Sequence, residues 1–488
     1  MRSKRLSTAL AVFIAIGYSF AALAQQPVTE SAEARDSFTG IQLKGRAPVN
    51  KQVLVPKFPR AQEATLENGL QIVLIEDRKL PTFALQLVID RGNIADPKGK
   101  EGLADATAAL LRQGTRTRSA EQIAETLDSL GASLGARADL GTTVVFTSGL
   151  VEHLDATLEI FADIVLNPTF PTSELELYKQ RLIAQIHNQR TASGFLAREQ
   201  LASAIYGEFP AGRLLPPETS VRSFTSSDLA EFHAANYAPN IAMVLVAGDL
   251  TLAELEPKLE RAFGKWPRKN LERTAFASVS APSKARVYVI DRPGSVQTSL
   301  IMGNLAIKGD DPDRFALTVM NRILGGSPAA RLFANLREEK GYTYGAYSSV
   351  TSDRYPGLAS ASAEVRTEVT EGAMKEFMAE FERIAKEPVS DAELENAKRS
   401  IIGGFALSLE NPQSFLGNIY QQKLYGFPPD YWEQYPKYIN AVTKEDVARV
   451  ASKYFNPATM QVVAVGQAEK IRDVMAKYGE LREVKAGE

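Results

Sequence analysis

The chain has 488 residues, of which 44% are hydrophobic and 23% charged, and its 56 lysines and arginines nearly balance its 58 aspartates and glutamates. Because there is no basic excess, nucleic acid and anionic lipid are not favoured as partners. The chain contains no cysteine, which excludes disulfides and thiolate metal sites. These features are typical of a soluble globular protein with two to four domains.

The N-terminus has the pattern of a secretory signal peptide. Arg2, Lys4 and Arg5 precede an apolar run, and residues 22–24 read Ala-Leu-Ala, an AxA-type cleavage site. We therefore expect cleavage after Ala24 and a mature chain that starts at Gln25. An uncleaved anchor is the alternative, but the apolar run is shorter than the roughly 20 residues that a membrane-spanning helix needs. With no cysteine in the remainder, the pattern predicts a bacterial periplasmic protein without stable membrane insertion.

Residues 25 to about 60 are expected to form an extended N-terminal extension. Beyond them, residues 102–115 read GLADATAALLRQGT. This segment resembles the active helix of the insulinase and pitrilysin family of zinc peptidases, GLAHxxEHxxFxGT, an inverted zincin motif. The residues that match the frame are Gly102, Leu103, Ala104, Gly114 and Thr115.

The residues that carry the chemistry of this motif are replaced. Asp105 stands at the first His, Ala108 at the Glu and Ala109 at the second His. In the motif, two His at i and i+4 share a helix face and bind one zinc, and the Glu polarises the attacking water. Alanine can do neither, so the resemblance implies a peptidase relative that cannot cleave alone.

The resemblance also implies a third zinc ligand, a Glu in a second helix some 70–80 residues further on. The corresponding segment is ELELYKQRLIAQIHNQR, where Gln185 stands at that position. A neutral amide is a poor zinc ligand beside a carboxylate or imidazole. The three histidines of the chain, His153, His187 and His233, show no metal-ligand spacing. His187 lies on the Gln185 helix, but a lone histidine is more often solvated than a ligand, so we predict no metal site.

An internal repeat divides the chain. The segment starting at Phe224 aligns without a gap with the segment starting at Val442, at an offset of 218 residues. Each copy has a Thr that can cap a helix, then helical periodicity, a Pro turn and a buried strand. Upstream, alternating strands at residues 83–90 and 299–307 are each followed by a turn and a helix.

The repeat predicts two homologous α+β domains, each a mainly antiparallel sheet packed with helices. We expect the N-terminal domain at residues 61–267, a polar linker at 268–284 and the C-terminal domain at 285–488. The charged amphipathic segments SAEQIAETLDSLGA and EGAMKEFMAEFERIAKE are expected to be helices with one packed face. The family resemblance implies that the two domains form half of a clamshell.

A second family match lies at ILGGSPAARLFANLREEKGYTYGAYSS, from Ile323. It resembles a pattern in which a helical Arg precedes a strand Tyr by seven residues, here Arg337 and Tyr344. The resemblance implies that this pair binds the substrate carbonyl opposite the zinc site, which suits two hydrogen-bond donors facing an oxygen that gains negative charge. The alternatives are a surface ion pair of Arg337 with Glu338 or Glu339, and a core or edge position for the Tyr344 ring.

Local structure around the pair follows from spacing. We expect a helix from Ala329 to about Glu339 that buries residues 332, 333 and 336 and ends at Gly341. Tyr342 and Tyr344 should then share one strand face, with Thr343 opposite, and Tyr342 and Tyr347 remain substitutes for Tyr344. Upstream of the helix, Gly325 and Gly326 form either an ordinary turn or a flexible loop over the cleft.

These patterns predict a subunit with no catalytic residues of its own. The leading hypothesis is the Arg/Tyr subunit of a periplasmic heterodimeric zinc metallopeptidase, whose HxxEH-bearing paralogous partner holds the zinc and cleaves peptides or unfolded polypeptides. A catalytically inactive peptide-binding or scaffold protein is the alternative, and a homodimer without zinc is conceivable. No Walker loop, Gly-x-Ser-x-Gly elbow or dinucleotide fingerprint favours another enzyme class.

Overall fold

A computed structural model describes residues 58–485. The predicted signal peptide and nearly all of the extension predicted at residues 25–60 lie outside this range. No helix of the described part combines the length and apolar character needed to cross a bilayer. We call residues 58–267 the first half and residues 285–485 the second half.

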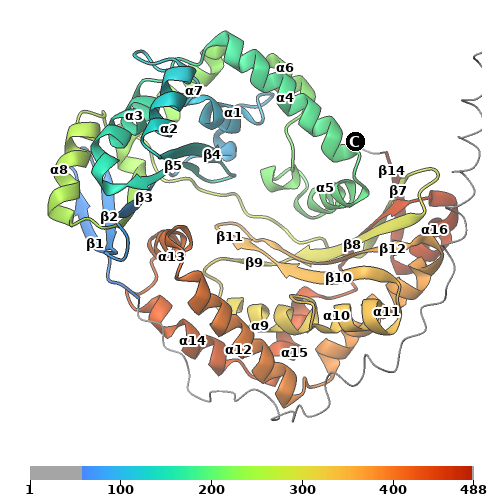
Figure 1. The fold of residues 1–488 in the computed structure, drawn as a ribbon. Helices are drawn as coiled ribbons and strands as arrows, with labels where there is room; N and C mark the ends of the chain where they lie inside the picture. The colour runs from blue at the N-terminus through green and yellow to red at the C-terminus, as the bar shows by residue number, and fades with distance from the viewer. Residues whose placement is uncertain (1–57, 486–488) are drawn as a thin grey trace, which may run out of the picture. The chain divides into compact units, whose positions relative to one another are not determined.

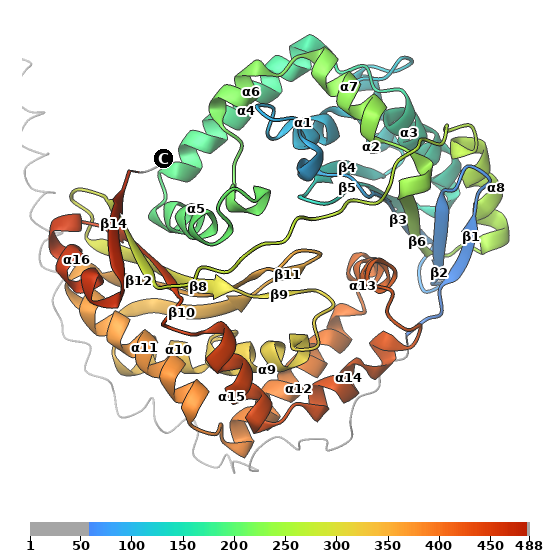
Figure 2. The same ribbon diagram turned by 180° about the vertical axis from the view of Figure 1, so that it is seen from behind.

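Each half contains one six-stranded sheet (Figures 1 and 2). In the first half the order is β1-β2-β6-β3-β5-β4, and only β2 and β6 pair in parallel. In the second half the order is β10-β12-β8-β13-β7-β14, and β7 pairs in parallel with β13 and β14. The strands of the first sheet are β1 (Gln62–Thr65), β2 (Gln71–Glu76), β3 (Thr82–Ile89), β4 (Ser133–Ala138), β5 (Thr143–Leu150) and β6 (Ala242–Gly248). Those of the second are β7 (Arg286–Asp291), β8 (Gln297–Leu305), β10 (Thr343–Val350), β12 (Leu358–Arg366), β13 (Gln461–Gly466) and β14 (Glu480–Val484), and a small parallel pair joins β9 (Ile307–Lys308) to β11 (Ser352–Asp353).

The helices follow the same order in both halves. The first half has α1 (Leu103–Leu110), α2 (Ala120–Ser129), α3 (Leu154–Leu166), α4 (Thr172–Arg190), α5 (Ser193–Tyr206), α6 (Glu218–Ser223), α7 (Ser226–Asn236) and α8 (Leu252–Phe263). The second half has α9 (Arg314–Leu324), α10 (Arg331–Phe333) with the π-helix η6 (Ala334–Glu339), α11 (Thr370–Lys386), α12 (Asp391–Ser408), α13 (Pro412–Tyr425), α14 (Tyr431–Ala441), α15 (Lys444–Tyr454) and α16 (Ala468–Met475). Short 3₁₀ turns lie at Asn93–Ala95, Val151–His153, Pro210–Gly212, Pro239–Ile241, Thr367–Val369 and Ala476–Tyr478.

The predicted α+β class with two mainly antiparallel sheets is therefore confirmed. The repeat is visible in the caps: Thr225 and Thr443 each accept a hydrogen bond from the backbone N–H of an Asp three residues later, at the starts of α7 and α15. These helices lead into β6 and β13, whose residues are all buried. Residues 268–284, where we predicted the linker, contain no helix or strand.

Both faces of each central strand are covered. In β6, Val244 and Val246 belong to the core beneath the helices of the first half, whereas Leu245 packs in a second cluster with Leu416 of α13. In β13, Val463 and Val465 likewise pack against α5. Each half thus packs one helix against the inner face of the other half's sheet (Figure 1). Helix α5 of the first half covers β8 and β13, and helix α13 of the second half covers β6 and β3.

Candidate functional site

Helix α1 holds the remnant of the zinc motif. Gly102 precedes it in the left-handed region, at φ +90°, and a Cβ there would lie 2.8 Å from Cβ of Pro216, so glycine is required on both grounds. Asp96 takes the place of a side-chain cap, because its carboxylate accepts from the backbone N–H of Gly102 at 2.7 Å and of Ala104 at 2.8 Å. Burial nevertheless raises the pKa of Asp96 to about 7.

The four positions that the resemblance aligns with zinc-site residues lie in different environments. Asp105 is half-buried in the first turn of α1, where its carboxylate accepts from Nδ2 of Asn93 at 2.8 Å. Burial raises the pKa of Asp105. Ala108 is fully buried, Ala109 is half-buried, and Gln185 is exposed on α4.

These side chains do not fit a zinc ion. Alanine offers no ligand atom, and within residues 58–485 no group of three or more His, Cys, Asp or Glu side chains is gathered so that it could hold a metal. Nε2 of His187 lies 2.8 Å from Oε2 of Glu218 at the surface. His233 is held by the carbonyl of Val165 at 2.8 Å, and burial lowers its pKa to about 4.

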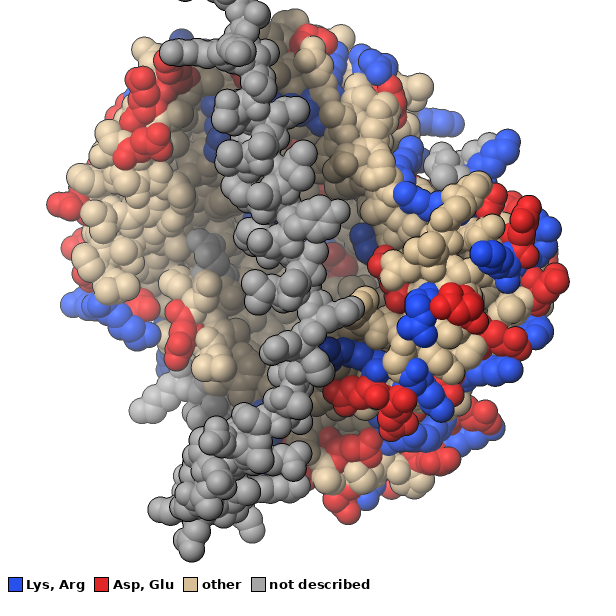
Figure 3. All heavy atoms as spheres, turned by 45° about the vertical axis from the view of Figure 1, so that its right-hand side comes forward, with Lys and Arg blue, Asp and Glu red and all other residues tan. Residues whose placement is uncertain are grey.

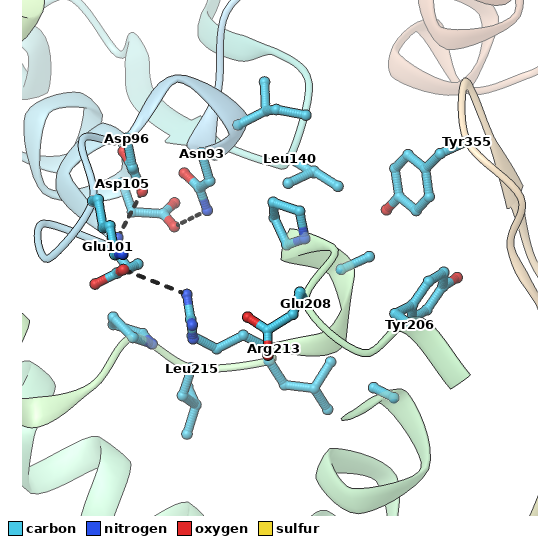
Figure 4. Close-up of a pocket in the computed structure, with 18 of the residues that line it drawn as sticks. Asn93, Asp96, Glu101, Asp105, Leu140, Tyr206, Glu208, Arg213, Leu215 and Tyr355 are labelled. Carbon is cyan, nitrogen blue, oxygen red and sulfur yellow. Dashed lines mark hydrogen bonds and ion pairs between the residues drawn. The ribbon is translucent and has the colours of Figure 1, made fainter. Parts of the chain in front are cut away.

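A cavity of about 700 Å³ opens beside this remnant (Figure 4). Asp96, Glu101 and Asp105 line it from the α1 side. Tyr206 and Arg213 come from the segment around α5, and Tyr355 comes from the loop between β10 and β12 of the second half. Both halves therefore contribute to one pocket, which contains Asp105 but not Gln185.

The second family motif folds into a π-helix followed by an edge strand. Leu332, Phe333 and Leu336 are buried, as predicted. The helix differs from the expected range, because Ala330 is extended at ψ 163° and the helix begins at Arg331; from Ala334 it continues as η6. π-Helical turns occur frequently at functional sites. Gly341, at φ +62°, follows its end.

Arg337 and Tyr344 are both exposed. The guanidinium of Arg337 lies 4.7 Å from the ring centroid of Phe333, four residues earlier, and has no ion-pair partner among the described residues, Glu338 and Glu339 included. The Tyr344 side chain is 90% exposed on β10, the edge strand of the second sheet.

The predicted shared face of Tyr342 and Tyr344 is wrong. Strand β10 begins at Thr343, so Tyr342 precedes it and packs half-buried against the core of the second half. A register shift in the pairing with β12 then falls between Thr343 and Ala346, and such a bulge changes which face a side chain points to. Tyr347 is 43% exposed, and its ring centroid lies 5.6 Å from that of Phe333.

Gly325 and Gly326 end helix α9, with both backbone N–H groups donating to the carbonyl of Asn321. Gly325 also accepts from the N–H of Ser348, and a Cβ at Gly325 would lie 2.4 Å from that nitrogen. These two glycines therefore form a packed helix end against β10, the geometry of an ordinary turn.

Charged side chains of both signs are interspersed over the described surface on the face drawn in Figure 3. This distribution agrees with the near balance of the composition. A one-signed patch that would attract a polyanion is absent from this face outside the grey atoms.

Two parts of the candidate site were not predicted from the sequence. Phe333 supports Arg337 and contacts Tyr347, and its i, i+4 spacing to Arg337 was the signal that could have identified it. The cavity next to α1 has no such signal, because its walls come from segments more than a hundred residues apart.

Comparisons with known proteins identify the family. Residues 71–216 match the insulinase (peptidase family M16) domain, and residues 223–401 match the peptidase M16 inactive domain. The chain is 25% identical to the uncharacterized zinc protease YmxG of Bacillus subtilis, over 80% of this chain and 95% of that protein. An uncharacterized zinc protease of Mycobacterium tuberculosis is 26% identical, over 80% of this chain and 90% of its own length.

Two solved structures share the fold. The peptidase M16 inactive domain from Pseudomonas fluorescens superposes with a TM-score of 0.77 at 29% identity, over 83% of this chain and 98% of that one. A protease from Helicobacter pylori superposes with a TM-score of 0.77 at 20% identity, over 84% and 100%. With its two matched domains and its repeated sheet topology, the chain belongs to the M16, or insulinase, family of peptidases.

Proposed function

We propose that this chain is the non-catalytic subunit of a periplasmic heterodimeric zinc metallopeptidase of the M16 family. Its partner is a paralogous chain with an intact HxxEH motif, which holds the zinc and cleaves peptides or unfolded polypeptides. Arg337 and Tyr344 of this chain complete the partner's site in trans, by donating hydrogen bonds to the substrate carbonyl.

The observation that carries the proposal is the exposure of Tyr344. An aromatic side chain that is 90% exposed on an edge strand contributes nothing to the core of its own chain, and its ring and hydroxyl are free to contact another molecule. Arg337 precedes it on an adjoining helical turn, also exposed and without an ion pair in the described part of the chain. Both donors are thus available to a molecule outside this chain.

The loss of the zinc ligands supports the same division of labour. The frame of the motif is kept at Gly102, with the backbone geometry that it requires, while Ala108 and Ala109 offer no ligand atoms. A chain that keeps the substrate-binding donors but lacks the metal ligands needs a second chain to supply the zinc for catalysis.

The test is peptidase activity of the reconstituted pair. Arg337→Ala in this chain should lower kcat/KM of the pair about 100-fold, the usual effect of removing one donor to the transition-state oxygen. Tyr344→Phe, which removes only the hydroxyl, should lower it about 10-fold or more. Full activity of the pair with both substitutions would contradict the assignment and favour a scaffold protein.

Matched controls separate function from folding. Arg399→Ala removes an exposed arginine whose ion pair, to Glu395 on the same helix, spans 3.9 Å, and it should leave activity unchanged. Tyr342→Phe and Tyr347→Phe test the two alternative tyrosines and should also be neutral. Because Arg337 and Tyr344 are exposed, their substitution should change the free energy of unfolding by no more than about 1 kcal/mol.

A further inference from the structure

The cavity beside α1 is held in a fixed shape by contacts between the two halves. The hydroxyl of Tyr206, on its wall, donates to the carbonyl of Pro356 at 2.9 Å. Next to Pro356, Arg354 forms an ion pair with Asp90 at 2.6 Å and donates to the carbonyl of Gly141 at 2.7 Å. The loop of the second half that closes the cavity is therefore fastened to the first half, and the pocket is formed before any ligand enters.

The lining of this cavity is acidic. Four carboxyl groups, those of Asp96, Glu101, Asp105 and Glu208, line it, against two basic side chains, Lys98 and Arg213. Arg213 lies nearest to Glu101, at 3.9 Å, and neither Asp96 nor Asp105 has an ion-pair partner in the described part of the chain.

Asp96 and Asp105 line the cavity close to one another. Burial raises the pKa of both carboxyls, and the charge of Asp105 adds to the increase at Asp96. A positive group between them would offset both the repulsion and the burial. Beside them, Nδ2 of Asn93 donates to the Asp105 carboxyl at 2.8 Å and orients it.

The rest of the wall is apolar and aromatic. Leu140, Leu215 and Leu358 line the cavity together with the rings of Tyr206 and Tyr355 (Figure 4). Such a wall suits a hydrocarbon stem. An anionic ligand would meet the carboxylates and is disfavoured.

We propose that this pocket binds a cationic group on an aliphatic stem, and that the group is a lysine or arginine side chain of a polypeptide. The pocket chemistry follows from the lining alone, whereas the polypeptide source rests on the proposed function. In this arrangement the place of the lost zinc site has become a specificity pocket. Asp105 and Asp96 hold the positive head, and the leucines and tyrosines hold the stem.

The test uses the full chain without any partner. Its affinity is measured by fluorescence anisotropy for two short N-acetylated, C-amidated peptides that differ only in a central lysine or norleucine. The lysine peptide should bind about tenfold more tightly, and Asp105→Asn, which keeps the shape of the side chain, should remove the difference. Glu395→Gln, an exposed carboxylate on α12 outside the cavity, is the control and should keep it.

Equal affinity for the two peptides would overturn the proposal. So would a lysine preference that survives Asp105→Asn or, should that variant not fold, one that survives Glu208→Gln, at an exposed residue of the lining. Nα-acetyl-lysine amide is the competitor that separates the sources: if it binds as tightly as the peptide, the ligand is a small amine and the polypeptide assignment is wrong. Because no partner is present, failure here leaves the test of Arg337 and Tyr344 unaffected.

Discussion

Asp96 shows how a single carboxyl can cap a helix and still resist ionisation. Its two hydrogen bonds from Gly102 and Ala104 favour the charged form, but burial outweighs them and raises the pKa from 3.8 to about 7. The folded protein therefore binds this proton more tightly than the unfolded chain does. The resulting stabilisation is fully present below about pH 4 and is lost as the pH rises through about 7.

Asp96→Asn should remove this pH dependence. Between about pH 5 and pH 7, the free energy of unfolding of the unaltered protein should fall relative to that of the variant, by up to about 1.4 kcal/mol per pH unit. The measurement is denaturant unfolding of both proteins at several pH values. His233, whose pKa is lowered to about 4, has the opposite slope but is present in both proteins and cancels. Parallel pH profiles would show that the Asp96 carboxyl is ionised throughout.

At the scale of elements, the crossed helices α5 and α13 join the two halves. Leu201 of α5 and Leu416 of α13 are both buried against the sheet of the opposite half. Replacing either with alanine removes buried methyl groups and leaves a cavity.

Leu201→Ala and Leu416→Ala should each lower the free energy of unfolding by about 2–5 kcal/mol. Leu177→Ala, at a leucine that is 38% exposed on α4, is the matched control and should cost less than about 1 kcal/mol. Chemical denaturation of the three variants makes the comparison. Losses at Leu201 and Leu416 no larger than at Leu177 would show that the crossed packing contributes little.

The sequence predicted the individual helices and strands, but not that each half packs a helix against the sheet of the other half. Thr225 and Thr443 predicted where their helices begin, because a cap is a local signal. The repeat at an offset of 218 residues indicated two equivalent sheets. The apolar runs of β6 and β13 indicated burial but could not say that the second face is covered by a helix from the other half. The π-helix at Arg337 was read as ordinary helix, because both conformations bury Leu332 and Leu336.

The candidate site was predicted only in part, because only its local features leave a signal in the sequence. Asp105, Ala108 and Ala109 were recognisable because a family motif fixes their spacing in one helix. The pocket that Asp105 lines depends on Tyr206 and Tyr355, which only the folded chain brings together. Contacts between residues so far apart in the sequence produce no periodic pattern from which the pocket could be predicted.

At the scale of the whole molecule, one guanidinium connects three segments. Arg354, in the loop after β11, pairs with Asp90 of the first half, with both side chains only 12% exposed. Its guanidinium also lies 4.8 Å from the ring centroid of Phe276, in the segment between the halves.

Arg354→Ala should destabilise the protein by about 3–5 kcal/mol, because it leaves the Asp90 carboxylate buried without its partner. Arg354→Ala combined with Asp90→Asn should recover part of that loss, since the uncompensated charge is then gone. Unfolding free energies of the two single variants and the double variant give the coupling between the sites. A loss below about 1 kcal/mol in Arg354→Ala would mean that this contact does not hold the halves together.

Zinc content and peptidase activity, measured together, test the proposed division of labour between two chains. Both are measured on this chain alone, on an HxxEH-bearing partner alone and on the mixture. We expect no bound zinc and no hydrolysis from this chain, and activity of the mixture that depends on Arg337. Stoichiometric zinc and hydrolysis from this chain alone would contradict it.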